Sequence, residues 1–177
     1  MSAIPGLEDC DGVILLGYHA MAGTPGAILE HTMSSATVQN YWINGRKAGE
    51  VAIDAGIAGE KGKPVIMVSG DDKVCAEAGE WLPGVTTAEV KKGITWKGGM
   101  LLPPEKAYAR IREKAKEAVG RLGERKPLVF DKPVRLRVER TERGLLPLSY
   151  SKPYMKIIDG RTYEVEGSTT EEALFRL

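Results

Sequence analysis

The chain has 177 residues, of which 42% are hydrophobic and 28% are charged, a composition typical of a soluble globular domain that can bury a core. Its formal net charge of +1 gives no electrostatic indication of a nucleic-acid or anionic-membrane partner. No apolar run reaches transmembrane length, the start lacks the pattern of a signal peptide, and the two cysteines lack CxxC spacing. We therefore expect a cytoplasmic protein with reduced thiols.

The first predicted strand, residues 13–16, leads into the segment with the most distinctive chemistry. His19 follows the strand, and residues 20–29 are small, uncharged and rich in Gly and Pro, which is typical of a loop. His31 follows this loop, and Glu50 begins the next predicted helix. Two imidazoles and a carboxylate suit zinc, and a histidine can act as acid or base near neutral pH. The alternative is a plain hydrogen-bonded histidine, because the spacing matches no short metal signature.

Residues 37–44 are β-branched and aromatic, and they predict a strand that ends at the turn signal Asn44-Gly45. Tyr41 and Trp42 could line a pocket, although packing in the core is the favoured interpretation. Residues 47–60 predict a helix with small apolar side chains, and Glu50 lies in its first turn. A carboxylate is favoured there by the helix dipole alone, which is the structural alternative to a metal ligand.

Residues 65–68 predict a second buried strand, with Asp71 and Asp72 at its carboxyl end. Asp71 is a candidate substrate-binding residue, whereas Asp72 is interpreted as the N-cap of a helix over residues 73–80. Residues 85–90 predict a third strand. Lys92, just beyond it, could hold a peptide carboxylate or an oxyanion, or could simply be a solvated lysine. Residues 96–102 are rich in Gly and are expected to form a loop.

The remaining residues predict a long amphipathic helix over residues 105–122 and a half-buried antiparallel strand over residues 133–140. A hairpin follows around Asp159-Gly160, and a capping pattern opens a last helix at residue 169. The predicted fold class is α/β, with a mixed sheet of parallel core strands, helices on its faces, and C-terminal β-hairpin elements. Residues 1–100 form the α/β portion that carries the site, and residues 101–177 pack into the same domain.

Four segments resemble, in the same order, the D-aminopeptidase family of zinc metallopeptidases, the DppA type: GYHAMAGTPGAILEHTM, YWINGRKAGE, GKPVIMVSGDD and LPGVTTAEVKKGI. The resemblance covers residues 7–94 and weakens beyond them. It implies a hydrolase that binds two zinc ions per subunit. Such an enzyme removes N-terminal D-residues, of D-Ala type, from short peptides. By position it implies that His19 and Glu50 are zinc ligands and that His31 is the catalytic histidine.

The sequence matches the second half of the family pattern. The Ser-x-Asp-x-Glu-Gly motif, whose acidic residues bind zinc in the family, is not found in it. His19 and Glu50 alone cannot complete a two-zinc site. One hypothesis is therefore a hydrolase whose missing ligands come from a separate chain carrying the first half. The other is a non-catalytic truncated family member that acts as a binding or assembly subunit. Because family members form rings, the resemblance also implies a homo-oligomer.

Overall fold

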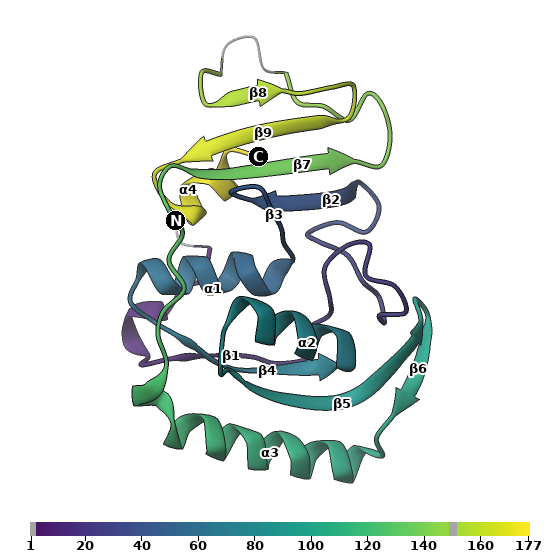
Figure 1. Ribbon diagram of the computed structural model, residues 1–177, viewed down its shortest axis with the longest axis vertical. Helices are drawn as coiled ribbons and strands as arrows, with labels where there is room; N and C mark the ends of the chain where they lie inside the picture. Colours follow the sequence, from purple (N-terminus) through teal and green to yellow (C-terminus); the bar gives the residue numbers. More distant parts are fainter. Residues whose placement is uncertain (1–2, 149–151) are drawn as a thin grey trace.

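The computed structural model describes residues 3–148 and 152–177, which form two β-sheets with helices between and around them (Figure 1). The first sheet has the strand order β1-β4-β5-β6. Strands β1 (Val13–Leu15), β4 (Val65–Asp71) and β5 (Thr86–Thr95) are parallel, and β6 (Gly98–Leu101) pairs antiparallel with β5. Every residue of β4 is buried, as expected for a central parallel strand covered on both faces. The predicted mixed sheet with parallel core strands is confirmed.

The second sheet is antiparallel, with the strand order β3-β2-β7-β9-β8. It consists of β2 (Val38–Ile43), β3 (Arg46–Lys47), β7 (Val134–Arg140), β8 (Met155–Ile157) and β9 (Thr162–Gly167). The alternation predicted for residues 133–140 is confirmed, because Val134, Leu136 and Val138 are all buried. The predicted C-terminal hairpin is the β8–β9 pair. Segments far apart in sequence thus share one sheet, with Tyr41 of β2 opposite Val138 of β7.

Two helices, α1 (Glu50–Glu60) and α2 (Asp72–Trp81), lie between the two sheets, and α3 (Pro104–Gly120) covers the outer face of the first sheet (Figure 1). The short helix α4 (Thr170–Phe175) packs against α1, β7 and β9. Short 3₁₀ turns occupy Leu7–Asp9 and Leu122–Glu124. One hydrophobic core joins both sheets through α1, whose Ile53 and Ile57 belong to the same buried cluster as Val68 and Leu136.

Several local predictions were wrong. The third strand, predicted to end at residue 90, continues in β5 to Thr95, so Lys92 lies within the strand and not just beyond it. The segment expected to be a glycine-rich loop contains β6, and its glycines permit close pairing, because a Cβ on Gly99 would lie 2.4 Å from the Lys92 carbonyl oxygen. The N-cap of α2 is Asp71 rather than Asp72, since one Asp71 oxygen accepts hydrogen bonds from the backbone N–H groups of Lys73 and Val74. Tyr41 is 1% exposed and belongs to the core, as favoured.

Both cysteines, Cys10 and Cys75, are free. None of the helices in the described ranges has the length and apolarity that crossing a bilayer requires.

Candidate metal centre

The carboxyl end of β4 holds the segment that carries His19. The backbone N–H of Tyr18 donates to the Ser69 carbonyl over 2.8 Å, and that of Gly17 donates to the Ser69 hydroxyl over 3.0 Å. Gly70 allows this approach, because a Cβ there would lie 2.3 Å from the Tyr18 carbonyl oxygen. His19 is therefore fixed at the carboxyl edge of the parallel strands, where ligand sites in α/β sheets gather.

His31 is brought back to His19 by the intervening loop. Its backbone N–H donates to the carbonyl of Ala20 over 3.3 Å. Leu29 and Met33, two residues to either side of His31, have φ angles of 55° and 64°, a left-handed conformation that non-glycine residues rarely adopt. Strain of this kind persists where the surrounding structure enforces it, and it is concentrated at functional sites.

Glu50 is the first residue of α1, so its carboxylate lies at the positive end of the helix dipole. One carboxylate oxygen accepts a hydrogen bond of 2.7 Å from the backbone N–H of Met33. The loop after His31 and the start of α1 are thereby joined at the carboxylate itself. The helix start and the Met33 N–H thus hold the Glu50 carboxylate in place without a bound ligand.

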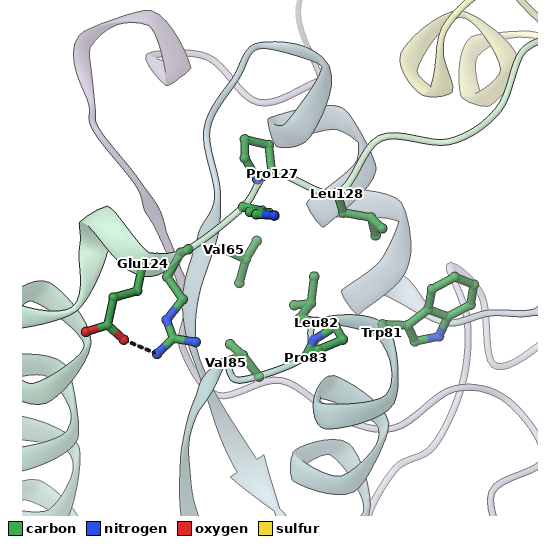
Figure 2. A pocket seen from close by; sticks show the side chains of 10 residues that line it. Val65, Trp81, Leu82, Pro83, Val85, Glu124, Pro127 and Leu128 are labelled. Atoms are coloured by element: carbon green, nitrogen blue, oxygen red, sulfur yellow. Dashed lines mark ion pairs between the residues drawn. The ribbon is translucent and has the colours of Figure 1, made fainter.

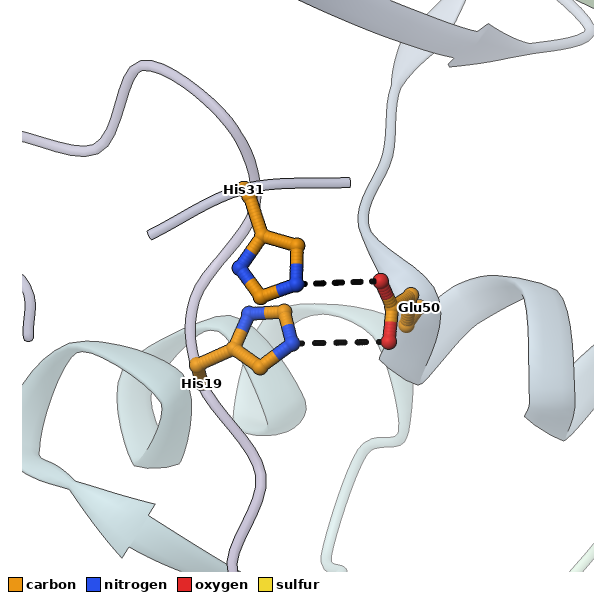
Figure 3. Close-up of side chains that lie close together, drawn as sticks. All are labelled: His19, His31 and Glu50. Carbon is orange, nitrogen blue, oxygen red and sulfur yellow. Dashed lines mark ion pairs between the residues drawn. The ribbon is translucent and has the colours of Figure 1, made fainter. Parts of the chain in front are cut away.

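The side chains of His19, His31 and Glu50 converge (Figure 3). Nε2 of His19 lies 3.4 Å from one Glu50 oxygen, and Nε2 of His31 lies 3.8 Å from the other. The two imidazole rings are stacked, with centroids 3.8 Å apart and planes 13° apart. One candidate ligand atom from each of the three residues lies within 4.8 Å of the others. The structure thus brings together residues that are separated by up to 31 positions in the sequence.

The backbone sets the tautomers of both histidines. Nδ1 of His19 lies 3.1 Å from the Ala20 carbonyl oxygen, and Nδ1 of His31 lies 2.6 Å from that of Leu29. A carbonyl oxygen only accepts, so each Nδ1 must carry the hydrogen, and in the neutral ring Nε2 keeps its lone pair. Two imidazole nitrogens and a carboxylate therefore face one another, with the backbone contacts that orient metal-binding histidines. This donor set fits zinc.

Without a cation, His19 and Glu50 shift each other's pKa. Burial lowers the pKa of His19, but the Glu50 carboxylate and the Ala20 carbonyl outweigh it, so this pKa lies above its ordinary value. Burial raises the pKa of Glu50, but His19 and the Met33 N–H outweigh it, so this pKa lies below its ordinary value. A metal ion at this position would compete with a proton for Nε2 of His19.

Comparisons with known proteins identify the family. The family model described as D-aminopeptidase, Peptidase_M55, matches residues 1–177. The chain belongs to the D-aminopeptidase family.

A D-aminopeptidase of Bacillus subtilis (strain 168) is 39% identical over 163 residues, which are 91% of this chain and 58% of that protein. A similar solved structure is the Zn-dependent D-aminopeptidase DppA from Bacillus subtilis, described as a self-compartmentalizing protease. It has a TM-score of 0.84 and 33% identity, covering 94% of this chain and 60% of that one. The chain therefore spans about three-fifths of the length of these relatives.

In this D-aminopeptidase family member, a carboxylate that the sequence did not single out supports the His19 loop. Glu77 of α2 is 5% exposed, and one of its oxygens accepts a hydrogen bond of 2.7 Å from the backbone N–H of Met21. The other oxygen is buried and has no hydrogen-bond partner among the described residues. Burial raises the Glu77 pKa to about 7. Its position in an amphipathic helix gave no signal, because helical glutamates are usually solvated.

A second supporting pair lies beside the cluster. The Tyr18 hydroxyl donates a hydrogen bond to the carboxylate of Asp54, which lies one helical turn after Glu50. Burial is the main cause that raises the pKa of both groups above their ordinary values. The pair anchors Tyr18, the residue before His19, to α1. The same helix carries Glu50, so α1 holds both His19 and Glu50 in place.

The other two candidate site residues lie apart from this cluster. Asp71 is 1% exposed, and its second oxygen accepts a hydrogen bond of 2.8 Å from the backbone N–H of Ile28. Asp71 thereby joins α2 to the loop between the two histidines. Lys92 is exposed on β5 and lines a separate surface cavity with Met100 and Arg110.

Proposed function

We propose that this chain forms a zinc-binding centre of an aminopeptidase that hydrolyses short peptides with an N-terminal D-residue, of D-Ala type. The observation that carries the proposal is the pair of imidazole Nε2 atoms facing the Glu50 carboxylate, with both Nδ1 atoms fixed by backbone carbonyls. Family membership and the zinc dependence of the DppA relative support it.

In this proposal, His19 and Glu50 hold zinc, which would polarise the scissile carbonyl and acidify water. His31 accepts and returns a proton at Nε2, because its Nδ1 hydrogen is committed to the Leu29 carbonyl. The side chain of His31 is 28% exposed, compared with 20% for His19, so His31 is the histidine more open to a substrate. Asp71 positions the loop between the two histidines by accepting the Ile28 N–H. The exposed Lys92 binds the carboxylate of the peptide substrate.

Two zinc ions per subunit require donors beyond the three that converge among the described residues. We propose that further ligands come from the part of the family pattern that these 177 residues do not include. The alternative function is a non-catalytic assembly subunit, and it is favoured by the same small number of donors. We also propose that the protein is cytoplasmic, which its free cysteines support. It forms a homo-oligomer that encloses its sites, which the description of the DppA relative as self-compartmentalizing supports.

The test is hydrolysis of D-Ala-Gly and L-Ala-Gly by the zinc-loaded chain, alone and with a polypeptide that carries the Ser-x-Asp-x-Glu-Gly motif. We expect release of D-Ala only, and a loss of roughly 10²-fold or more in His31→Ala. Glu113→Gln, on the exposed face of α3, is the control and should leave the rate unchanged. Zinc binding without turnover under either condition would favour the assembly subunit, and turnover of both isomers would refute the D-specificity.

A further inference from the structure

Two surface cavities differ in their relation to the candidate metal centre. The cavity in Figure 2, of about 360 Å³, lies between the end of α2 and residues 124–128, and its lining includes none of His19, His31 and Glu50. A smaller cavity, of about 130 Å³, is lined by His31 itself. The smaller cavity is below the size of a complete site for a small molecule. It therefore suits a single chemical group of a ligand rather than a whole peptide.

Glu30 supplies the charge of this smaller cavity. Apart from His31, the other described residues of its lining are uncharged: Ala22, Gly23, Ser35, Val38, Gln39, Trp96 and Thr141. One Glu30 carboxylate oxygen accepts a hydrogen bond from the backbone N–H of Gly23. Glu30 is only partly exposed, but its second oxygen retains surface accessible to solvent and has no hydrogen bond or ion pair within the described ranges. This oxygen is open to a cationic group that enters the cavity.

The backbone holds Glu30 in this position. The N–H of Leu29 donates to the Trp96 carbonyl over 2.8 Å, and the indole N–H of Trp96 donates to the Glu30 carbonyl over 3.1 Å. The next residue is His31, whose Nδ1 lies 2.6 Å from the Leu29 carbonyl oxygen. A carboxylate and the histidine of the proposed reaction thus line one cavity from a single fixed segment. Such preorganisation lowers the entropy cost of binding a ligand.

Two lysines lie around the cavity without neutralising Glu30. A Cβ on Gly23 would lie 2.9 Å from Nζ of Lys47, and Nζ of Lys97 lies 5.7 Å from the centroid of the Trp96 ring. Both lysines are exposed, and neither forms an ion pair with Glu30 in the part of the chain that the structure describes. The negative charge of Glu30 is therefore available to a ligand.

We propose that Glu30 binds the α-ammonium group of the peptide substrate through its unpaired oxygen. An ammonium group donates hydrogen bonds and a carboxylate accepts them, so the contact is a charge-assisted hydrogen bond. The proposal rests on the aminopeptidase function proposed above, because an aminopeptidase must recognise a free amino terminus. Asp71 cannot take this role, since its oxygens accept backbone N–H groups, and Lys92 has the wrong charge.

The experiment is a titration of the chelator-treated chain with D-alaninamide at constant ionic strength and about pH 6.5, where an α-amino group is protonated. Binding is followed through the indole N–H resonance of Trp96, and chelation keeps zinc from taking the amine. We expect saturable binding that is at least about fivefold weaker in Glu30→Gln. Glutamine keeps an oxygen for the Gly23 N–H, so the loop contact survives. Glu142→Gln, which removes an exposed charge beside the lining residue Thr141, is the matched control and should bind within about twofold of the wild type.

N-acetyl-D-alaninamide, which lacks the ammonium group, should not bind. Hydrolysis of D-Ala-Gly by the zinc-loaded proteins separates this inference from the proposed function. Glu30-dependent binding without hydrolysis supports the inference and counts against the proposed function only. Hydrolysis with the same KM in the wild type and in Glu30→Gln overturns the inference and leaves the proposed function standing. The inference is also overturned if D-alaninamide does not bind saturably, if Glu30→Gln binds it like the wild type, or if the acetylated amide binds equally well.

Discussion

Glu77 is a buried carboxyl group that is bonded to the loop holding His19. Its pKa is raised to about 7 from 4.5, mainly by burial. The unfolded chain therefore ionises at lower pH than the folded chain. Any stabilisation from this group is complete below pH 4.5 and is lost as the pH rises toward 7. Glu77 thus contributes less to the stability of the fold at neutral pH than in mild acid.

We predict that Glu77→Gln removes this pH dependence. The wild type should lose up to about 3 kcal/mol of unfolding free energy from this group between pH 4.5 and pH 7, whereas the variant should lose much less over that range. Glutamine keeps an oxygen for the Met21 N–H, so the loop contact survives. Urea unfolding at a series of pH values measures the difference between the two proteins. Parallel curves would contradict the raised pKa.

At the scale of single elements, the start of α2 depends on Asp71. Its two oxygens accept hydrogen bonds from the backbone N–H groups of Lys73, Val74 and Ile28. We predict that Asp71→Ala lowers the unfolding free energy by about 2–4 kcal/mol. Asp72→Ala is the matched comparison and should cost less, about 1–2 kcal/mol, because its partly solvated side chain accepts from one backbone N–H group, that of Gly93, and from Lys73. Equal losses in urea unfolding would show that the cap is misassigned.

The packing of α1 depends on a glycine. A Cβ on Gly59 would lie 1.7 Å from the Leu128 carbonyl oxygen, whereas one on Gly79 of α2 meets nothing within 4 Å. We predict that Gly59→Ala lowers the unfolding free energy by at least about 2 kcal/mol. Gly79→Ala should raise it by about 0.5–1 kcal/mol, because alanine is the better helix former. Thermal unfolding of both variants checks this contrast, and a neutral Gly59→Ala would contradict the close crossing.

Elements with a strong local pattern could be predicted from the sequence. The buried run of β4, the alternation of β7 and the apolar spacing of α3 all appear in the structure. The strand β6 was missed, because Gly98 and Gly99 are typical of a loop. These glycines form a strand by pairing closely with β5, beside the Lys92 carbonyl. The α2 cap was misplaced by one residue, since two adjacent aspartates carry the same local signal. Local chemistry predicts elements with a strong pattern, whereas a weakly patterned strand such as β6, or the exact boundary of a helix such as α2, depends on a partner strand or a single hydrogen bond.

At the scale of the whole molecule, the arrangement of two sheets depends on contacts that no local pattern contains. The pairing of β2 with β7 joins residues about a hundred positions apart, and such pairings are set by the shared core rather than by sequence neighbours. The same limit applies to the site. Its residue types are compatible with zinc, but the stacking of His19 on His31 and the burial of Glu77 follow from the packing of loop, helix and sheet.

In the proposed zinc centre, His19 and Glu50 are the ligands of a cluster that also contains His31. The most direct measurement is a calorimetric titration of the chelator-treated chain with zinc at neutral pH, repeated for His19→Ala and Glu50→Gln, with Glu113→Gln as the control. We predict saturable binding in the wild type and the control. Each of the two site variants should bind at least about tenfold more weakly. No saturable binding, or equal affinity in all four proteins, would contradict the claim.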